Sequence, residues 1–234
     1  CTFTENEATS GAGLCNNYAG SPTISDCVFS KNAASSSGGG MQNASSSPTV
    51  ANCEFLENSV VGTNENGRGG GMSNSVSDAT ANGRTYNCTF IGNTAYLGGG
   101  VYSYYASSLT MFNCTFSANV ATQGGGILNE TSSPTITNCI FWGDTATSEN
   151  EIFNSSDSTP AITYSCVNGG DTSNGNITLD PDFVDPGNGD YSLELGSPCI
   201  DAGTSTGAPL ADILGVSRPQ GAKVDMGAYE HAGK

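Results

Sequence analysis

The residues best suited to bind or transform a ligand are two arginines and three nearby tyrosines. Each arginine ends an Asn-Gly-Arg tripeptide, and the chain has only six lysines and arginines in all. The candidate binding residues are Arg68, Arg84, Tyr102, Tyr104, Tyr105, Glu65 and Asp78. Aromatic rings stack on the faces of sugars, and a guanidinium group holds a carboxylate with two parallel hydrogen bonds. We therefore expect a glycan-binding groove, with ordinary surface loops over which the tyrosines pack as the alternative.

These candidates lie in and beside the irregular part of a sequence that otherwise repeats about every 26 residues. Each unit has a cysteine, a phenylalanine two residues later, an asparagine three further on, a glycine triplet and an aliphatic residue. The cysteines that begin the units are Cys1, Cys27, Cys53, Cys88, Cys114, Cys139 and Cys166. The third unit is longer than the others and contains both arginines. Because Arg68 and Arg84 flank the two ends of the strand predicted over 69–74, we expect them to wall one groove.

Apolar residues alternate with polar ones within each unit, as around Ile136, Cys139 and Phe141. Such alternation predicts short, half-buried strands. Strands and tight turns at one fixed period predict a coil of about three strands per turn, with turns roughly 4.8 Å apart. We predict an all-β parallel β-helix of about seven turns over residues 1–166, whose stacked apolar residues form a core that no single repeat can bury. The residues before the cysteines should stack as an amide ladder, and they are Asp26, Asn52, Asn87, Asn113 and Asn138.

Repeats that pair F-x-x-N with G-G-G-aliphatic, as in Phe116–Asn119 and Gly124–Ile127, resemble those of polymorphic outer-membrane proteins and of bacterial right-handed β-helix surface proteins. The resemblance implies a right-handed coil in a bacterial protein that is exported to the cell surface or the extracellular space. The fold is compatible with adhesion to a polysaccharide or cell-surface glycan. Because no cap precedes the first repeat, we also expect that this turn could stack on another molecule, which would give self-assembly into fibres by end-to-end association. The same fold hosts enzymes, so the resemblance alone does not decide between these functions.

Catalysis is the alternative. Pectate-lyase-like β-helices use an arginine or lysine beside Ca²⁺ that carboxylates hold, and polygalacturonase-like β-helices use clustered aspartates as acid and base. Neither arrangement is evident in this sequence, and Arg68 or Arg84 with Glu65 and Asp78 comes nearest to the first. We therefore expect a non-enzymatic protein, with a lyase or hydrolase that acts on an acidic polysaccharide as the alternative.

Seven of the nine cysteines occupy one column that the alternation predicts to face inward. Stacked cysteines lie about one strand spacing apart, which exceeds the separation of roughly 3.8 Å between the Cβ atoms of a disulfide. We therefore expect a ladder of buried thiols that act as small apolar side chains. Cys15 falls at an outward position and is a candidate for an intermolecular thiol, whereas the sequence assigns no partner to Cys199.

The segment from about Leu179 to Glu230 resembles the C-terminal module of many bacterial secreted β-helices, through its D-P-x-F-V-D-P and D-x-G-A-Y-E motifs. We expect residues 167–234 to complete the coil and to cover its open end, because an uncovered turn exposes unpaired backbone and apolar surface. Four carboxylates could hold a structural Ca²⁺ or simply cap turns, and no other cofactor is expected. They are Asp180, Asp182, Asp185 and Asp190.

Charge restricts the possible partners. The chain has 22 Asp and Glu against 6 Lys and Arg, which gives a formal net charge of −16. Nucleic-acid binding needs clustered cations to neutralise phosphates, so we expect no nucleic-acid partner. No apolar run reaches the length of a membrane span, so we expect no such span either.

Overall fold

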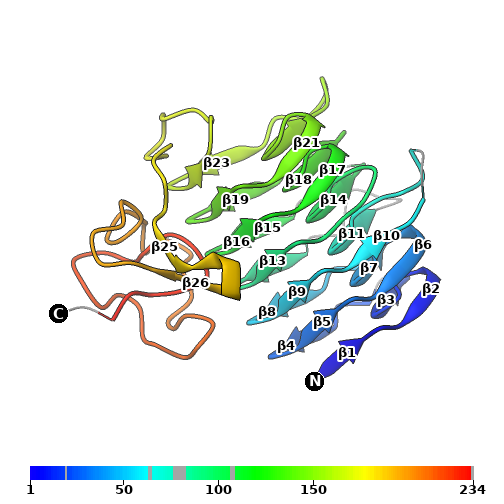
Figure 1. The fold of residues 1–234 in the computed structure, drawn as a ribbon, viewed down its shortest axis with the longest axis horizontal. Coiled ribbons are helices and arrows are strands. Elements are labelled where there is room, and N and C mark those ends of the chain that lie inside the picture. Colours follow the sequence, from blue (N-terminus) through cyan, green and yellow to red (C-terminus); the bar gives the residue numbers. More distant parts are fainter. Residues whose placement is uncertain (19, 63–64, 76–82, 106–108, 233–234) are drawn as a thin grey trace.

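Short parallel strands wind into a coil whose turns stack on one another (Figure 1). The computed structural model describes the chain except for residues 19, 63–64, 76–82, 106–108 and 233–234. One sheet has seven strands and two have six, so the predicted all-β parallel coil is confirmed, with six complete turns and the first strand of a seventh. In the described part of the chain, no helix is long and apolar enough to cross a membrane.

Three sheets, which we call A, C and D, form the faces of the coil, and the short sheet segments B lie at the corner between A and C. Sheet A contains β1 (Thr2–Thr4), β5 (Val28–Ser30), β9 (Glu54–Leu56), β13 (Thr89–Ile91), β16 (Thr115–Ser117), β20 (Ile140–Trp142) and β24 (Cys166–Val167). Segments B contain β2 (Glu7–Ser10), β6 (Ala33–Ser37), β10 (Ser59–Val60), β17 (Val120–Gln123) and β21 (Thr145–Ser148). Sheet C contains β3 (Leu14–Asn17), β7 (Met41–Ala44), β11 (Met72–Ser75), β14 (Val101–Tyr104), β18 (Ile127–Glu130) and β22 (Ile152–Asn154). Sheet D contains β4 (Thr23–Ser25), β8 (Thr49–Ala51), β12 (Arg84–Tyr86), β15 (Thr110–Phe112), β19 (Thr135–Thr137) and β23 (Ala161–Thr163).

A ladder of phenylalanines from sheet A forms the centre of the core. Neighbouring rings are nearly parallel and their centroids lie between 4.5 and 4.9 Å apart, along Phe3, Phe29, Phe55, Phe90, Phe116 and Phe141. Fully buried aliphatic side chains of sheets C and D pack against these rings, among them Val101 and Ile136. The glycine triplets make this packing possible: a Cβ on Gly100 would lie 2.6 Å from the carbonyl oxygen of Gly126 and 2.9 Å from the ring of Phe116.

A ladder of asparagine amides follows the phenylalanines. Each asparagine donates from Nδ2 to Oδ1 of the next turn at 2.8–3.0 Å, along Asn6, Asn32, Asn58, Asn93 and Asn119, and Asp144 accepts the last of these bonds. From Asn32 onward each amide also donates to a backbone carbonyl on the preceding turn, as Asn93 Nδ2 does to Phe55 at 2.9 Å. These bonds satisfy polar groups that would otherwise be buried without partners.

The amide ladder predicted before the cysteines forms only in part. Asn52 donates to Asp26 at 3.2 Å, Asn87 to Asn52 at 3.1 Å and Asn138 to Asn113 at 3.2 Å. Between Asn87 and Asn113 the ladder is interrupted, because the Asn113 amide donates to the C-terminal segment instead. All five residues have φ between 49° and 55°, a left-handed conformation that Asn and Asp tolerate better than most residues.

The inward cysteine column is six residues long rather than seven. In the last turn Ser165 takes its place: Ser165 Oγ accepts a hydrogen bond from Cys139 N, as Cys139 Sγ does from Cys114 N. Cys166 pairs in register with Ile140, on the outer face of sheet A. The prediction that Cys166 faces inward is therefore wrong, because a slip of one residue in a strand reverses the side to which a side chain points.

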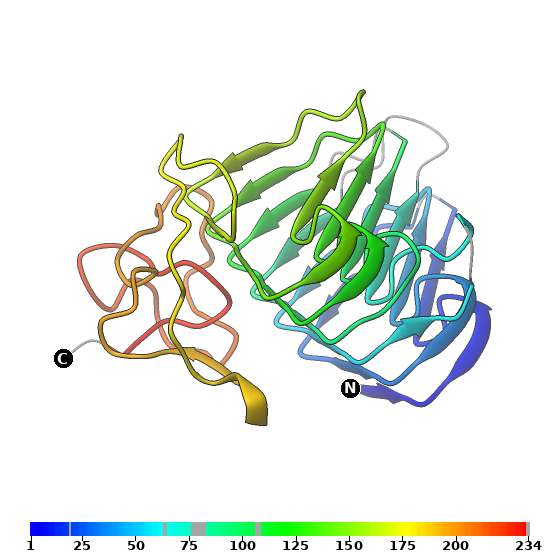
Figure 2. The same cartoon turned by 45° about the horizontal axis from the view of Figure 1, so that its top comes forward.

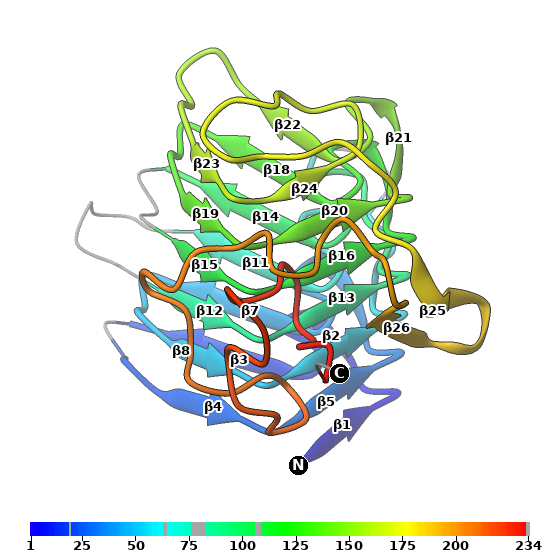
Figure 3. The same cartoon turned by 90° about the vertical axis from the view of Figure 1, so that its left-hand side faces the viewer.

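The C-terminal module lies along the flank of the coil and not over its end, contrary to the expectation (Figures 1, 2 and 3). It contains β25 (Phe183–Asp185), the 3₁₀ turn η1 (Pro186–Asn188) and β26 (Asp190–Leu193), followed by loops. Its backbone accepts hydrogen bonds from the corner between sheets D and A: Asn87 donates to Ala211 at 2.7 Å and Asn138 to Thr204 at 2.8 Å. The module therefore covers the amides of the corner ladder over several turns, and Asn87, Asn113 and Asn138 are buried.

Asn93→Ala tests how much the buried asparagine ladder stabilises the coil. The variant removes the acceptor of Asn58 N and Nδ2, both of which are buried. We expect the free energy of unfolding to fall by about 2–4 kcal/mol in a urea titration, because a buried donor loses its partner. The exposed residue Asn17 provides the control, since Asn17→Ala should change the free energy of unfolding by less than about 0.5 kcal/mol. Equal, small effects of both substitutions would contradict a stabilising ladder.

Candidate functional site

Outward side chains of sheet C build a hollow of about 290 Å³, which we call the sheet C hollow. Strand register places Tyr102 of β14 beside Leu128 of β18, and Leu128 beside Phe153 of β22. The same register places Tyr104 beside Glu130. Side chains from the loops complete the lining, which includes Glu65, Arg68, Tyr96, Gln123, Glu130 and Phe153.

Tyr102 lies against the hollow as a buried support. Its side chain points away from the core, as the alternation predicts, but it is 0% exposed because it packs with Leu97 and Leu128. The phenol donates a hydrogen bond of 2.6 Å to Oε2 of Glu130. Burial, together with this bond, raises the pKa of Tyr102 far above its ordinary value. The phenol therefore remains protonated at physiological pH, where it can position the Glu130 carboxylate but cannot act as a base.

Arg68 lies over the aromatic rings of β14. Its guanidinium carbon is 5.4 Å from the ring centroid of Tyr102 and 5.6 Å from that of Tyr104. Its Nε donates a hydrogen bond of 2.9 Å to the backbone carbonyl of Glu65. Cation–π contacts at these distances are attractive, and together with the hydrogen bond they fix the direction of the side chain. The structure thus brings Arg68, Glu65, Tyr102 and Tyr104 together, four of the seven residues that the sequence singled out.

The other three predicted residues are not part of this arrangement around Arg68. Arg84 begins β12 in sheet D, between Thr49 and Thr110 of the adjacent strands, and does not line the sheet C hollow. The structure therefore separates the two arginines, because the strand after β11 belongs to another face of the coil. Tyr105 is 49% exposed, and its ring centroid is 5.9 Å from that of Tyr104, at the edge of the cluster. Asp78 lies outside the described residues.

Residues that sequence reasoning missed supply much of the lining. Glu130, Gln123, Tyr96 and Phe153 come from regular units, whereas the irregular third unit and the tyrosines at positions 102, 104 and 105 of the following unit drew attention. A signal was available for Glu130, since alignment of the repeat columns already places it beside Tyr104. The position of Tyr96 depends on how its loop folds back over the sheet, which the repeat pattern does not specify.

The predicted calcium ligands do not cluster. The Oδ1 atoms of Asp180 and Asp190 accept bonds from the backbone N atoms of Asp182 and Ser192, and Asp185 accepts one from Asn188 Nδ2. Outside the masked segments, no group of three or more His, Cys, Asp or Glu could hold a metal ion. Three of these carboxylates thus cap their own turns, which was the alternative to calcium binding.

Cys15 is exposed on the outer face of β3, as the alternation predicts, and its thiol donates to Oε1 of Gln42 at 3.7 Å. The thiol is free. Its accessibility is compatible with an intermolecular bond, which stays a prediction.

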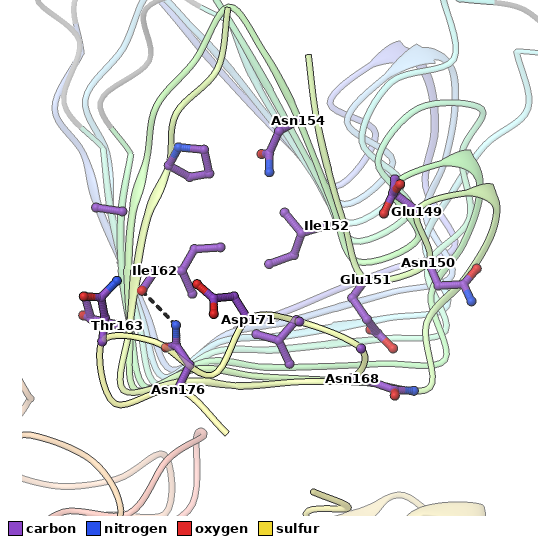
Figure 4. A pocket seen from close by; sticks show the side chains of 16 residues that line it. Glu149, Asn150, Glu151, Ile152, Asn154, Ile162, Thr163, Asn168, Asp171 and Asn176 are labelled. Carbon is purple, nitrogen blue, oxygen red and sulfur yellow. Dashed lines mark hydrogen bonds between the residues drawn. The ribbon is translucent and has the colours of Figure 1, made fainter. Parts of the chain in front are cut away.

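A second hollow, of about 750 Å³, lies at the last turn of the coil (Figure 4). Its apolar lining includes Ile152, Ile162 and Val167, the last members of the core columns. Asp171 reaches over this hollow from the following loop (Figure 4). Because its apolar walls are core residues without a next turn to pack on, this hollow is best described as the uncovered end of the core.

Beside this end, two carboxyl groups are buried together. Asp144 ends the asparagine ladder, where its Oδ1 accepts bonds of 2.8 Å from N and Nδ2 of Asn119. Glu151 Oε1 accepts a bond from Gly143 N, whereas Asp144 Oδ2 and Glu151 Oε2 are buried without another partner. Burial raises the pKa of both groups, and the adjacent charge of Glu151 raises that of Asp144 further. The side-chain interaction between the two residues also raises the pKa of Asp144 and lowers that of Glu151, so Asp144 is the member of the pair that holds its proton more tightly.

Comparison with protein families agrees with this architecture. The model of the family described as "Right handed beta helix region" matches residues 1–141, more than half of the chain. The chain belongs to the right-handed β-helix family. No curated protein and no solved structure matches it. Since β-helices differ in function, what this β-helix does must be argued from the residues on its surface.

Asp144→Asn tests the energetic effect of the buried acid pair in this β-helix. A folded-state pKa above the ordinary Asp value of about 3.9 means that stability is greatest below that value and falls as the pH rises through the raised pKa. An asparagine continues the amide ladder without a charge. We expect the variant to exceed the native chain by about 1–2 kcal/mol in the free energy of unfolding at pH 8, and the gain to vanish near pH 4.

Urea titrations at the two pH values measure this difference. Asp171→Asn is the matched control, because Asp171 is exposed and its bonds with Ser173 lower the pKa of its carboxyl group. The control should show no gain at pH 8. A native chain as stable as Asp144→Asn at pH 8 would contradict the inferred pair.

Proposed function

We propose that this β-helix is an extracellular, non-enzymatic surface or matrix protein that binds glycan at the sheet C hollow. The observation that carries the proposal is Arg68, held over the rings of Tyr102 and Tyr104 beside a carboxylate that Tyr102 positions. Half-buried Tyr96 and Phe153 line the same hollow and offer apolar surface to a sugar ring. A few fixed polar groups among aromatic side chains are typical of sites that bind small polar ligands.

Charge favours a neutral glycan as the ligand. The chain has a formal net charge of −16, and Glu65 and Glu130 both line the hollow beside the single cation Arg68. A polyanion is repelled by this surface, whereas sugar hydroxyl groups donate to the carboxylates and accept from Arg68 and Gln123. The proposed ligand is therefore a neutral polysaccharide or cell-surface glycan.

The repeats support a location at the bacterial surface. Their F-x-x-N and G-G-G-aliphatic motifs resemble those of polymorphic outer-membrane proteins. Assembly of the protein into fibres by end-to-end association remains a prediction.

A polysaccharide hydrolase or lyase is the second candidate. One observation favours it: Glu65 and Glu130 line one hollow, and hydrolysis of a glycosidic bond needs two carboxyl groups as acid and as base or nucleophile. The raised pKa of Tyr102 argues against lyase chemistry that uses this phenol as the base. Binding without turnover therefore ranks first.

Arg68→Ala tests the proposed site. We expect the native chain to be retained on at least one immobilised neutral polysaccharide, and the variant to bind it roughly tenfold more weakly, a loss of about 1.4 kcal/mol. Arg84→Ala is the matched control, because it removes the same side chain from an exposed position on another face of the coil. Its affinity should equal that of the native chain, and thermal unfolding shows that each variant is folded.

The same incubations distinguish binding from catalysis. New reducing ends, or the ultraviolet absorbance of unsaturated sugars, would establish the enzymatic alternative if Glu130→Gln abolished them. No retention on any neutral or acidic polysaccharide would refute the glycan-binding proposal, as would equal losses for Arg68→Ala and Arg84→Ala.

A further inference from the structure

Two cysteines from separate parts of the chain meet where the C-terminal module contacts the coil. Cys166 begins β24, the last strand of sheet A, and Cys199 belongs to the module. Both side chains are 0% exposed. They share one buried cluster with Ile140, Leu193 and Met226, which come from both sides of this contact.

The strand register explains why Cys166 faces the module. Val167 pairs with Phe141 and packs into the core, so the preceding residue, Cys166, points to the outer face beside Ile140. Ser165 fills the position that cysteines occupy in the earlier turns. The strand spacing that keeps the stacked thiols of the core apart therefore does not apply to Cys166, whose neighbour comes from a different segment of the chain.

The two cysteine side chains lie in the same buried cluster, at the contact between the last strand of sheet A and the C-terminal module. A hydrogen bond between the Cys199 and Cys166 side chains is the largest cause that raises the pKa of Cys199, ahead of burial. Cys166 Sγ in turn donates to the backbone carbonyl of Leu179 at 3.2 Å. Both groups are thiols in this structure, side by side in an apolar cluster without a third thiol among the cluster's residues.

We propose that Cys166 and Cys199 form a disulfide bond that fastens the C-terminal module to the last strand of the β-helix. The oxidant is a disulfide donor, either a small molecule or a protein. The thiolate of one cysteine attacks the donor, which forms a mixed disulfide and releases one donor thiolate. The thiolate of the second cysteine then attacks the first cysteine's sulfur and releases the second donor thiol, so two protein thiols are oxidised and one donor disulfide is reduced.

Because both cysteines are buried in the folded protein, the stage at which a disulfide donor can reach them is limited. Both sulfur atoms are inaccessible when the module is docked, so the donor reaches them during folding or when the module detaches. Once formed, the bond closes the chain between residues 166 and 199 and restricts the unfolded state. The proposal depends on the contact between coil and module and not on glycan binding.

Mass spectrometry of the full chain tests the bond directly. The protein is folded in a buffer of reduced and oxidised glutathione, denatured without reductant and alkylated. Of the nine cysteines, we expect seven to be alkylated, nine less the two in the bridge, and proteolysis to yield one linked peptide that contains Cys166 and Cys199. Nine alkylated cysteines, or a linked peptide with another pair, would overturn the proposal.

Thermal unfolding tests the effect of the bond. We expect oxidation to raise the Tm of the native chain by roughly 5–10 °C relative to the protein in dithiothreitol. Cys15→Ser should keep this difference, because Cys15 is exposed on sheet C, whereas the double variant Cys166→Ser/Cys199→Ser should lose it. Equal Tm values for the oxidised and reduced native chain would count against a stabilising bond, and the peptide map decides the pairing even if the double variant does not fold.

Discussion

Equivalent side chains of successive turns stack about one strand spacing apart. Each turn of this coil must therefore place the same kind of side chain at the same position as the turn before it. The phenylalanine rings meet this constraint with centroids between 4.5 and 4.9 Å apart, and the buried amides meet it with hydrogen bonds of 2.8–3.0 Å. The close stacking of the turns also requires the glycine triplets, since a Cβ on Gly100 would overlap the next turn. A change of length within a strand would break all three ladders together, so extra residues are accommodated between strands.

Two substitutions within the core ladders occur in the last two turns. Asp144 replaces an asparagine beside Glu151, and Ser165 replaces a cysteine beside Cys166. Both changes occur where a ladder ends, because the final residue of a ladder has no following turn to satisfy its hydrogen bonds. The C-terminal module meets the coil in the same region, through Ile140 and Cys166. The end of the repeat and the docking of the module therefore depend on the same few residues.

The outer face of sheet C is free of the core's constraint and differs from turn to turn. Its first outward column reads Cys15, Gln42, Ser73, Tyr102, Leu128 and Phe153 along successive turns. Large apolar side chains occur only in the last three of these turns, where loop residues such as Leu97 cover them and leave a hollow. A right-handed β-helix can thus acquire a binding surface through a few outward residues while its core ladders remain unchanged.

The sequence by itself determined the coil, its period and most of its core, because each stacked neighbour lies one repeat away and the periodicity records the contact. It also placed Arg68, Glu65, Tyr102 and Tyr104 in one region. It did not determine that Arg84 lies on another face, that Tyr102 is covered, or that Cys166 faces outward, since each depends on a corner, a loop or a slip of one residue. Only the tertiary structure decided where the C-terminal module docks: Asn113 meets Asp225 and Asn87 meets Ala211 across more than 100 residues of chain. Such contacts depend on the complementary shape of two surfaces, and no repeat in the sequence records them.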